Sequence, residues 1–255
     1  MLNIEIPQSK IDKIKIAFFD SDGVCVERGT EIMESSDGVK YNSSFQTNVL
    51  SDEMADKLNQ LSKKIKVVIA SGRSLLYLRT MYSKIIGENV IFMAENGNVW
   101  FKSGRIVSRK YPVSYFEKLA TIRCQIKNLP ILGFEPKQFI LTVHCEKELQ
   151  EVYDIVKKYD PNGELRIMWN GEAFDIQRDG TSKGDALKWI LGNIEKDNFK
   201  LENTIAIGDR INDKEMVRAA YIGVSADIGK LNAKYYTTGK KLGGEVLVDY
   251  LLKKL

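Results

Sequence analysis

The sequence lacks the features that mark exported, membrane-spanning and nucleic-acid-binding proteins. Its three cysteines form no CxxC pair, and its first residues have no basic region followed by an apolar one. We therefore expect free thiols in a reducing cytoplasm. No apolar run approaches the ~20 residues that a membrane-spanning helix needs. The net charge of +4 is mild and the lysines are scattered, which indicates solvated faces and neither a nucleic-acid nor a membrane partner.

The composition that remains is typical of a globular protein. The chain has 255 residues, of which 44% are hydrophobic and 28% charged, enough for one large domain or for a domain with a smaller module. Short apolar segments predict buried strands over 14–20, 66–70, 90–94 and 204–207. Helical spacing predicts helices over 51–64, from Ser71 to about 86, and over 183–195, 213–220 and 243–254. Strands that alternate with helices imply parallel βαβ units.

The pattern changes in the middle of the chain. We expect a helix, an alternating strand, a second helix and a hairpin over 113–128, 139–145, 146–159 and 164–177. We therefore predict an α/β fold in which 1–108 and 180–255 form a core with a Rossmann-like parallel sheet. Residues 109–179 form an inserted α+β cap module. The cleft between the two parts is the expected site.

Two carboxylates stand at the end of the first predicted strand. Asp20 and Asp22 are one residue apart and precede Gly23, so a regular strand aims both the same way from its C-terminal end. Ligands bind at that end in open α/β sheets. Two acids together repel each other unless a cation lies between them, and Mg²⁺ prefers such oxygen ligands. A carboxylate here can act as a nucleophile or carry a proton. The alternative is two acids that cap a turn.

Three further motifs carry the same kind of chemistry. Ser71 and the N–H groups of Gly72 and Arg73 follow another strand and can form an anion cradle, or Ser71 can simply cap a helix. Lys183 stands at a helix start, where its charge opposes the helix dipole. It can meet a phosphate there or be an ordinary surface lysine.

The last motif follows the strand predicted over 204–207. Asp209 comes directly after Gly208, and Asp213 lies four residues later. One of these acids can ligate a cation while the other orients the ligands; the alternative is an acidic turn that caps a helix.

Taken together, the four motifs resemble those of the haloacid dehalogenase (HAD) superfamily. The predicted cap resembles that of the Cof-type, or type IIB cap, subgroup, which contains sugar phosphatases, phosphomannomutases, mannosyl-3-phosphoglycerate phosphatases and archaeal phosphoglycolate phosphatases. The resemblance implies that Asp20 is the nucleophile and a Mg²⁺ ligand, and that Asp22 is the acid/base and supplies a backbone carbonyl to the metal. It further implies that Asp209 and Asp213 complete the Mg²⁺ site, and that phosphate or substrate is bound by Ser71, Gly72, Arg73, Lys183 and Asn212.

The resemblance implies a Mg²⁺-dependent phosphomonoesterase that acts on a small phosphorylated metabolite, a sugar phosphate or a phosphorylated acid, through an aspartyl-phosphate. The alternatives are a phosphomutase of the same fold and a non-catalytic binding or regulatory protein. Residues 25–50 are predicted to form a hairpin, similar to the flap that capless Kdo-8-phosphate phosphatases use at a subunit interface, which points to a homo-oligomer. Substrate choice is expected to rest with the cap, where the candidates are His144, Arg166, Trp169, Asn170, Glu172 and Arg178. His144, Trp169 and Arg178 can instead be packing or surface residues.

Overall fold

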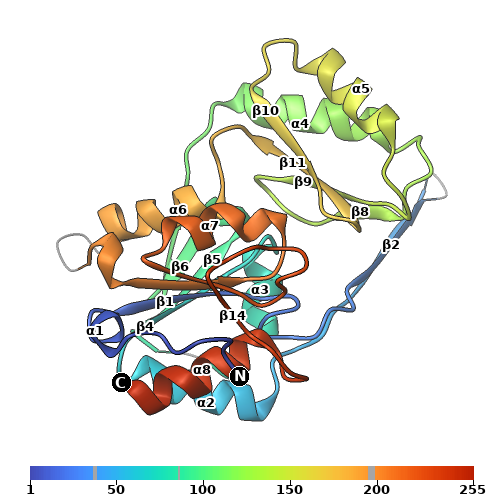
Figure 1. The fold of residues 1–255 in the computed structure, drawn as a ribbon. Coiled ribbons are helices and arrows are strands. Elements are labelled where there is room, and N and C mark those ends of the chain that lie inside the picture. The colour runs from blue at the N-terminus through green and yellow to red at the C-terminus, as the bar shows by residue number, and fades with distance from the viewer. Residues whose placement is uncertain (37–38, 86, 195–198) are drawn as a thin grey trace. The chain divides into compact units, whose positions relative to one another are not determined.

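The chain forms two compact units (Figure 1). A computed structural model describes residues 1–36, 39–85, 87–194 and 199–255. The first unit comprises Met1–Arg28, Asn48–Ser108 and Ser182–Leu255, and the second comprises Gly29–Thr47 and Arg109–Thr181. Within the described residues, no helix is both long and apolar enough to cross a membrane.

An eight-stranded sheet is the framework of the first unit. Its strands, in spatial order, are β14 (Tyr235–Tyr236), β13 (Ile222–Ser225), β12 (Thr204–Gly208), β1 (Ile16–Asp20), β4 (Lys66–Ala70), β5 (Val90–Ala94), β6 (Val99–Lys102) and β7 (Arg105–Ser108). Neighbouring strands are parallel except in the pairs β5–β6 and β6–β7, which are antiparallel, so β6 alone runs against the other strands. Strand β1 is fully buried between β12 and β4, as a continuous apolar run predicts. The predicted α/β class is confirmed.

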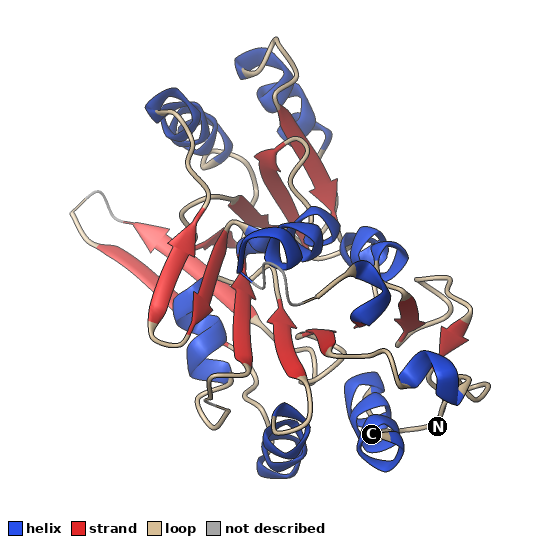
Figure 2. Ribbon diagram, turned by 90° about the vertical axis from the view of Figure 1, so that its left-hand side faces the viewer, coloured by secondary structure: helices blue, strands red, loops and turns tan. Residues whose placement is uncertain are grey.

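Helices cover both faces of this sheet (Figures 1 and 2). They are α1 (Gln8–Ile11), α2 (Asp52–Ser62), α3 (Leu75–Met81), α6 (Lys183–Trp189), α7 (Lys214–Ala219) and α8 (Gly243–Lys254). Leu187 of α6 and Met216 of α7 pack on Phe18 and neighbouring side chains of one face. Helices α2 and α8 lie side by side against the other face. Since strand side chains alternate between faces, both faces of the central strands are buried.

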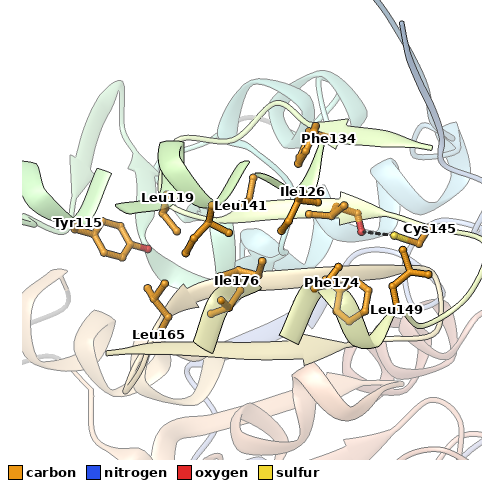
Figure 3. Close-up of a cluster of buried hydrophobic side chains, with 14 residues drawn as sticks. Tyr115, Leu119, Ile126, Phe134, Leu141, Cys145, Leu149, Leu165, Phe174 and Ile176 are labelled. Atoms are coloured by element: carbon orange, nitrogen blue, oxygen red, sulfur yellow. Dashed lines mark hydrogen bonds between the residues drawn. The ribbon is translucent and has the colours of Figure 1, made fainter. Parts of the chain in front are cut away.

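The second unit is a smaller α+β structure. Its four-stranded antiparallel sheet has the order β10 (Leu165–Trp169), β11 (Ala173–Arg178), β9 (Leu141–His144) and β8 (Gly133–Glu135). Two helices, α4 (Val113–Ile126) and α5 (Gln150–Tyr159), share its apolar core. Figure 3 shows Leu119 and Ile126 of α4 near Leu141, Phe174 and Ile176 of the sheet.

A two-stranded hairpin, β2 (Glu31–Ser36) and β3 (Tyr41–Gln46), belongs to the second unit. The sequence predicted this hairpin but assigned it to the core with the rest of 1–108. Hydrogen bonds between residues far apart in the sequence explain the difference. The Glu34 N–H donates to the Leu132 carbonyl (3.2 Å), and the Glu34 carboxylate accepts from the Phe134 N–H (2.9 Å) and from Arg123 (2.9 Å). These contacts tie the hairpin to α4 and to residues beside and within β8.

Most predicted elements are present, with shifted ends. Ser51 caps α2 as predicted, by accepting a hydrogen bond from the Met54 N–H. The helix predicted from Ser71 to about 86 begins only after its cap at Ser74 and ends at Met81; residue 86 lies outside the described residues. The segment predicted as one helix over 183–195 consists of the α-helix Lys183–Trp189 followed by a π-helical turn, Ile190–Ile194. Residue 195 lies outside the described residues. Strands β8, β13 and β14 and helix α1 were not predicted.

Candidate functional site

The candidate site lies where three neighbouring strands end. Asp20 is the last residue of β1, Ser71 directly follows β4, and Asp209 directly follows β12. Because these strands are parallel neighbours in the order β12-β1-β4, their carboxyl ends meet at one edge of the sheet. The three residues that the sequence placed at strand ends are therefore on one side of the same unit.

Lys183 joins two of the predicted acids. It is the first residue of α6, after the cap residue Ser182. Its Nζ donates hydrogen bonds to Asp20 Oδ1 (2.5 Å) and to Asp213 Oδ1 (2.6 Å), and its side chain is only 1% exposed. Lys183 is therefore not a surface lysine. Its ammonium group is held where it neutralises two buried carboxylates.

The electrostatics of this group are dominated by burial. Burial and the neighbouring charge of Asp213 raise the pKa of Asp20 well above its ordinary value, although Lys183 opposes the rise. Burial alone would lower the pKa of Lys183, but the two carboxylates outweigh it and raise that pKa. Burial likewise raises the pKa of Asp209. Burial and mutual repulsion thus disfavour the charged form of these carboxylates, so an added positive charge would stabilise them.

Asp209 has two unlike carboxylate oxygens. Its Oδ2 accepts a hydrogen bond from Arg28 Nη2 (2.6 Å). Its Oδ1 is buried and has no hydrogen-bond partner among the residues that the structure describes. An unpaired buried carboxylate oxygen is costly, so a ligand for this oxygen is to be expected.

The donor set fits a hard divalent cation. Three carboxylate oxygens lie within 4.8 Å of one another, one from each of Asp20, Asp209 and Asp213. Asp213 already uses both of its oxygens, since Oδ1 accepts from Lys183 and Oδ2 accepts from the backbone N–H groups of residues 209 and 210 at 3.1 and 3.3 Å. This leaves Asp20 and the unpartnered Asp209 Oδ1 as the oxygens best placed for Mg²⁺, which prefers oxygen ligands.

The side chain of Asp22 does not belong to that group of three acids and pairs with Arg73 instead. Its carboxylate accepts two hydrogen bonds from Arg73, at 3.0 Å from Nη2 to Oδ1 and 3.3 Å from Nε to Oδ2. Paired bonds of this kind fix the plane of a carboxylate. Ser71 Oγ accepts from the Arg73 N–H (3.1 Å), so Ser71 shapes this turn, and the helix cap is Ser74 instead. Gly72 is half-buried in the same turn, and Asn212 is half-buried in the 3₁₀ turn Ile211–Asp213, beside Asp213.

Two glycines are required by close approach. Gly23 has a φ of +86°, and a Cβ there would lie 2.6 Å from Asp209 Oδ2 and 2.8 Å from Arg28 Nε. A Cβ on Gly208 would lie 2.3 Å from the Cβ of Asp213. Any larger residue at either position would displace the acids.

The residues that the sequence singled out in the second unit have different kinds of contacts. Trp169 packs against Phe174 (ring centroids 4.7 Å apart) at the edge of the core, and Asn170 Oδ1 accepts the N–H groups that close the β10–β11 turn. The Arg178 guanidinium lies over the Tyr111 ring (5.7 Å). Arg166 is half-buried on β10, and Glu172 is exposed in the turn. Trp169 thus packs at the edge of the core and Asn170 closes a turn, while substrate contact by these residues stays a prediction.

A polar cluster in this unit joins His144, which the sequence singled out, to residues that it did not. Lys137 Nζ lies 3.1 Å from Glu135 Oε2 and 2.8 Å from Thr142 Oγ1, which in turn donates to Asp175 (2.5 Å). His144 Nε2 lies 3.5 Å from the same Glu135 oxygen. The sequence offers one signal for this polar cluster: polar residues alternate with apolar ones in the strands that carry Glu135, Thr142 and Asp175. Arg28, in the first unit, was also missed, because a lone loop arginine carries no motif.

Comparisons with known proteins agree with this fold. The phosphoglycolate phosphatase of Staphylothermus marinus is 26% identical over 223 residues, which cover 83% of this chain and 84% of that protein. The 5-amino-6-(5-phospho-D-ribitylamino)uracil phosphatase YcsE of Bacillus subtilis is 25% identical and covers 74% of this chain and 83% of its own length. A haloacid dehalogenase-like hydrolase from Bacteroides thetaiotaomicron shares the fold with a TM-score of 0.65, at 15% identity over 95% of this chain and all of that one.

These findings define the class of protein: the chain is a phosphatase of the HAD superfamily. Its residues 37–221 match the family model described as trehalose-phosphatase, so the chain belongs to that family. The C-terminal domain of the Candida albicans trehalose-6-phosphate phosphatase has the same fold, with a TM-score of 0.64 at 16% identity, over 97% of this chain and 94% of that one. The family match includes Ser71, Lys183, Asp209 and Asp213 and begins after Asp20 and Asp22.

Proposed function

We propose that this phosphatase is a Mg²⁺-dependent phosphomonoesterase that works through an aspartyl-phosphate on Asp20. One observation carries the proposal. Asp20 ends the central strand with its carboxylate against Lys183, beside a buried Asp209 oxygen that has no partner among the described residues. A nucleophilic carboxylate, a fixed positive charge and an open ligand position are the elements that phosphoryl transfer requires.

In the proposed reaction, an Asp20 carboxylate oxygen attacks phosphorus and the bond from phosphorus to the ester oxygen breaks. Asp22 donates a proton to the departing oxygen, so that the product leaves as an alcohol. Asp22 then removes a proton from a water that attacks the aspartyl-phosphate, which releases inorganic phosphate and restores Asp20. The paired hydrogen bonds from Arg73 hold the Asp22 carboxyl in one orientation for both steps.

The other site residues act on charge and position. Lys183, the Ser71 hydroxyl and the N–H groups of the turn after β4 would hold the phosphoryl oxygens, with Asn212 beside them. Mg²⁺, held by Asp20, Asp209 and the Asp22 carbonyl with Asp213 in support, would neutralise charge on the phosphoryl group. Because phosphoryl transfer depends mainly on such positioning and neutralisation, no further reactive group is needed.

The substrate class is part of the proposal. Two relatives are named as phosphatases of phosphoglycolate and of a phosphoribitylamino uracil, and the matched family is named for trehalose phosphate. The three substrates in these names are small phosphorylated metabolites. We propose a sugar phosphate or a phosphorylated acid, chosen by the second unit. The test is phosphate release from a panel of both kinds; a substrate whose phosphate is transferred within the product and never released would indicate a mutase instead.

The Asp20→Asn variant tests the mechanism. With Mg²⁺ and an aryl phosphate, it should lose activity on the order of 10⁴-fold or more, while its thermal unfolding stays close to that of the wild type. Asp56→Asn is the matched control, since Asp56 is exposed on α2 of the same unit, and it should keep full activity. Near-normal turnover by Asp20→Asn would show that Asp20 is not the nucleophile.

We also propose that the protein forms a homo-oligomer, is cytoplasmic and binds neither nucleic acid nor membrane. Strand β3 supports the first point: its residues are almost all exposed, none of them is charged, and its described pairing is with β2 alone. Such an edge can pair with another strand. Light scattering coupled to size-exclusion chromatography tests it; a monomer at every concentration would exclude the oligomer.

A further inference from the structure

Arg28 contacts the candidate cation site but belongs to none of its motifs. It ends the first segment of the first unit, and its carbonyl accepts a hydrogen bond from Asn48 Nδ2 (3.0 Å). Its guanidinium lies against Gly23, where a Cβ would meet it at 2.8 Å. Its side chain is 30% exposed, whereas that of Asp209 is 7% exposed. The arginine thus reaches from the rim of the site to a buried carboxylate.

The contact with Arg28 makes the two carboxylate oxygens of Asp209 unlike each other. Arg28 Nη2 donates to Oδ2 at 2.6 Å. The other oxygen, Oδ1, stays buried with no hydrogen-bond partner among the described residues. A charge-assisted hydrogen bond to one oxygen restricts rotation of the carboxylate, so it determines where the second oxygen lies.

Two physical effects of Arg28 on a bound cation have opposite signs. Its positive charge would repel a cation and weaken binding. Its hydrogen bond would hold Asp209 in a ligating orientation and strengthen binding, and loss of such a supporting partner typically costs 10–100-fold in metal affinity. The short distance, the burial of Asp209 and the unpartnered Oδ1 favour the second effect, because part of the arginine charge is already neutralised by Oδ2.

We propose that Arg28 is a positioning residue for the divalent cation: it holds Asp209 by Oδ2 so that Oδ1 is free to bind Mg²⁺. This inference rests on the proposed Mg²⁺ site and adds a residue that the motifs do not contain.

The test is Mg²⁺ binding by isothermal titration calorimetry, without substrate. Arg28→Met should weaken Mg²⁺ binding by 10-fold or more. Arg28→Gln keeps an amide donor without the charge, so it should lie between Arg28→Met and the wild type. Arg105→Met is the control, because Arg105 is exposed on β7 of the same unit, and it should bind as the wild type does. Circular dichroism establishes that each variant is folded, and Arg28→Gln serves alone if Arg28→Met is not.

The outcomes separate this inference from the proposed function. Wild-type binding with a weakened Arg28→Met and an intermediate Arg28→Gln supports it. Unchanged or tighter binding by the variants overturns the positioning role and leaves the proposed Mg²⁺ site intact. Absence of Mg²⁺ binding to the wild type at millimolar concentration overturns both.

Discussion

Replacement of Lys183 by methionine tests how the site holds its charges together. The lysine Nζ lies 2.5 Å from Asp20 and 2.6 Å from Asp213, and the three side chains are 1%, 7% and 0% exposed. Methionine has a similar length and no charge, so the variant leaves two buried carboxylates without their shared cation. Breaking a buried ion pair by removing one partner costs about 3–5 kcal/mol. For a chain of this size that corresponds to a fall in Tm of about 6–20 °C, measured by scanning calorimetry at pH 7 in EDTA.

Three comparisons make the result specific. The double variant Lys183→Met/Asp20→Asn should recover part of the lost Tm, because one of the two uncompensated carboxylates is removed. Excess Mg²⁺ should narrow the gap between Lys183→Met and the wild type, because the cation replaces the missing charge. Lys254→Met, which removes an exposed pair with Glu5, should change little. A Tm for Lys183→Met within about 2 °C of the wild type in EDTA would refute the reasoning, since the two carboxylates could not then both be charged in the native state.

Two further predictions concern the second unit. Phe174→Ala removes a fully buried ring that packs edge-on against Tyr153 at 5.4 Å, and it should lower the free energy of unfolding by about 3–5 kcal/mol; a urea midpoint equal to the wild type would contradict this. Burial raises the pKa of Asp160, but hydrogen bonds from Lys118 (2.5 Å) and the Leu165 N–H (2.7 Å) outweigh it and lower that pKa. The carboxylate therefore stabilises the fold above its unfolded pKa of about 3.9, and the stability is lost as pH falls through the folded value. The wild type should unfold at higher urea than Asp160→Asn at pH 6, and the difference should shrink towards pH 3; a constant difference would contradict the assignment.

Much of the fold could be predicted because local patterns agree with tertiary burial. The apolar run that became β1 is buried on both faces, and a run without alternation is what a central parallel strand requires. Ser51 caps its helix as predicted, because a cap is a contact between residues three apart. Strand β8, only three residues long, carries too few residues to show a period.

The candidate site could be predicted in part for the same reason. Parallel strands bring their carboxyl ends to one edge, so Asp20, Ser71 and Asp209 were expected together, and the structure brings them together. Arg28 could not be expected there, because its partner Asp209 lies 181 residues away in sequence and no periodicity links them. The buried Lys137 pairs were missed likewise, since an isolated lysine is usually exposed.

The sequence alone determined the class of fold, the order of most of the elements and the residues that end the central strands. These follow from local periodicity, turn residues and motif spacing, which act over a few residues. Only the tertiary structure decided that strands β2 and β3 pack with the second unit and that Lys183 is shared by two acids. It also decided that one Asp209 oxygen is paired while the other has no partner among the described residues. The physical reason is that burial and pairing depend on groups far apart along the chain, so the charge balance of the site exists only once the strands have come together.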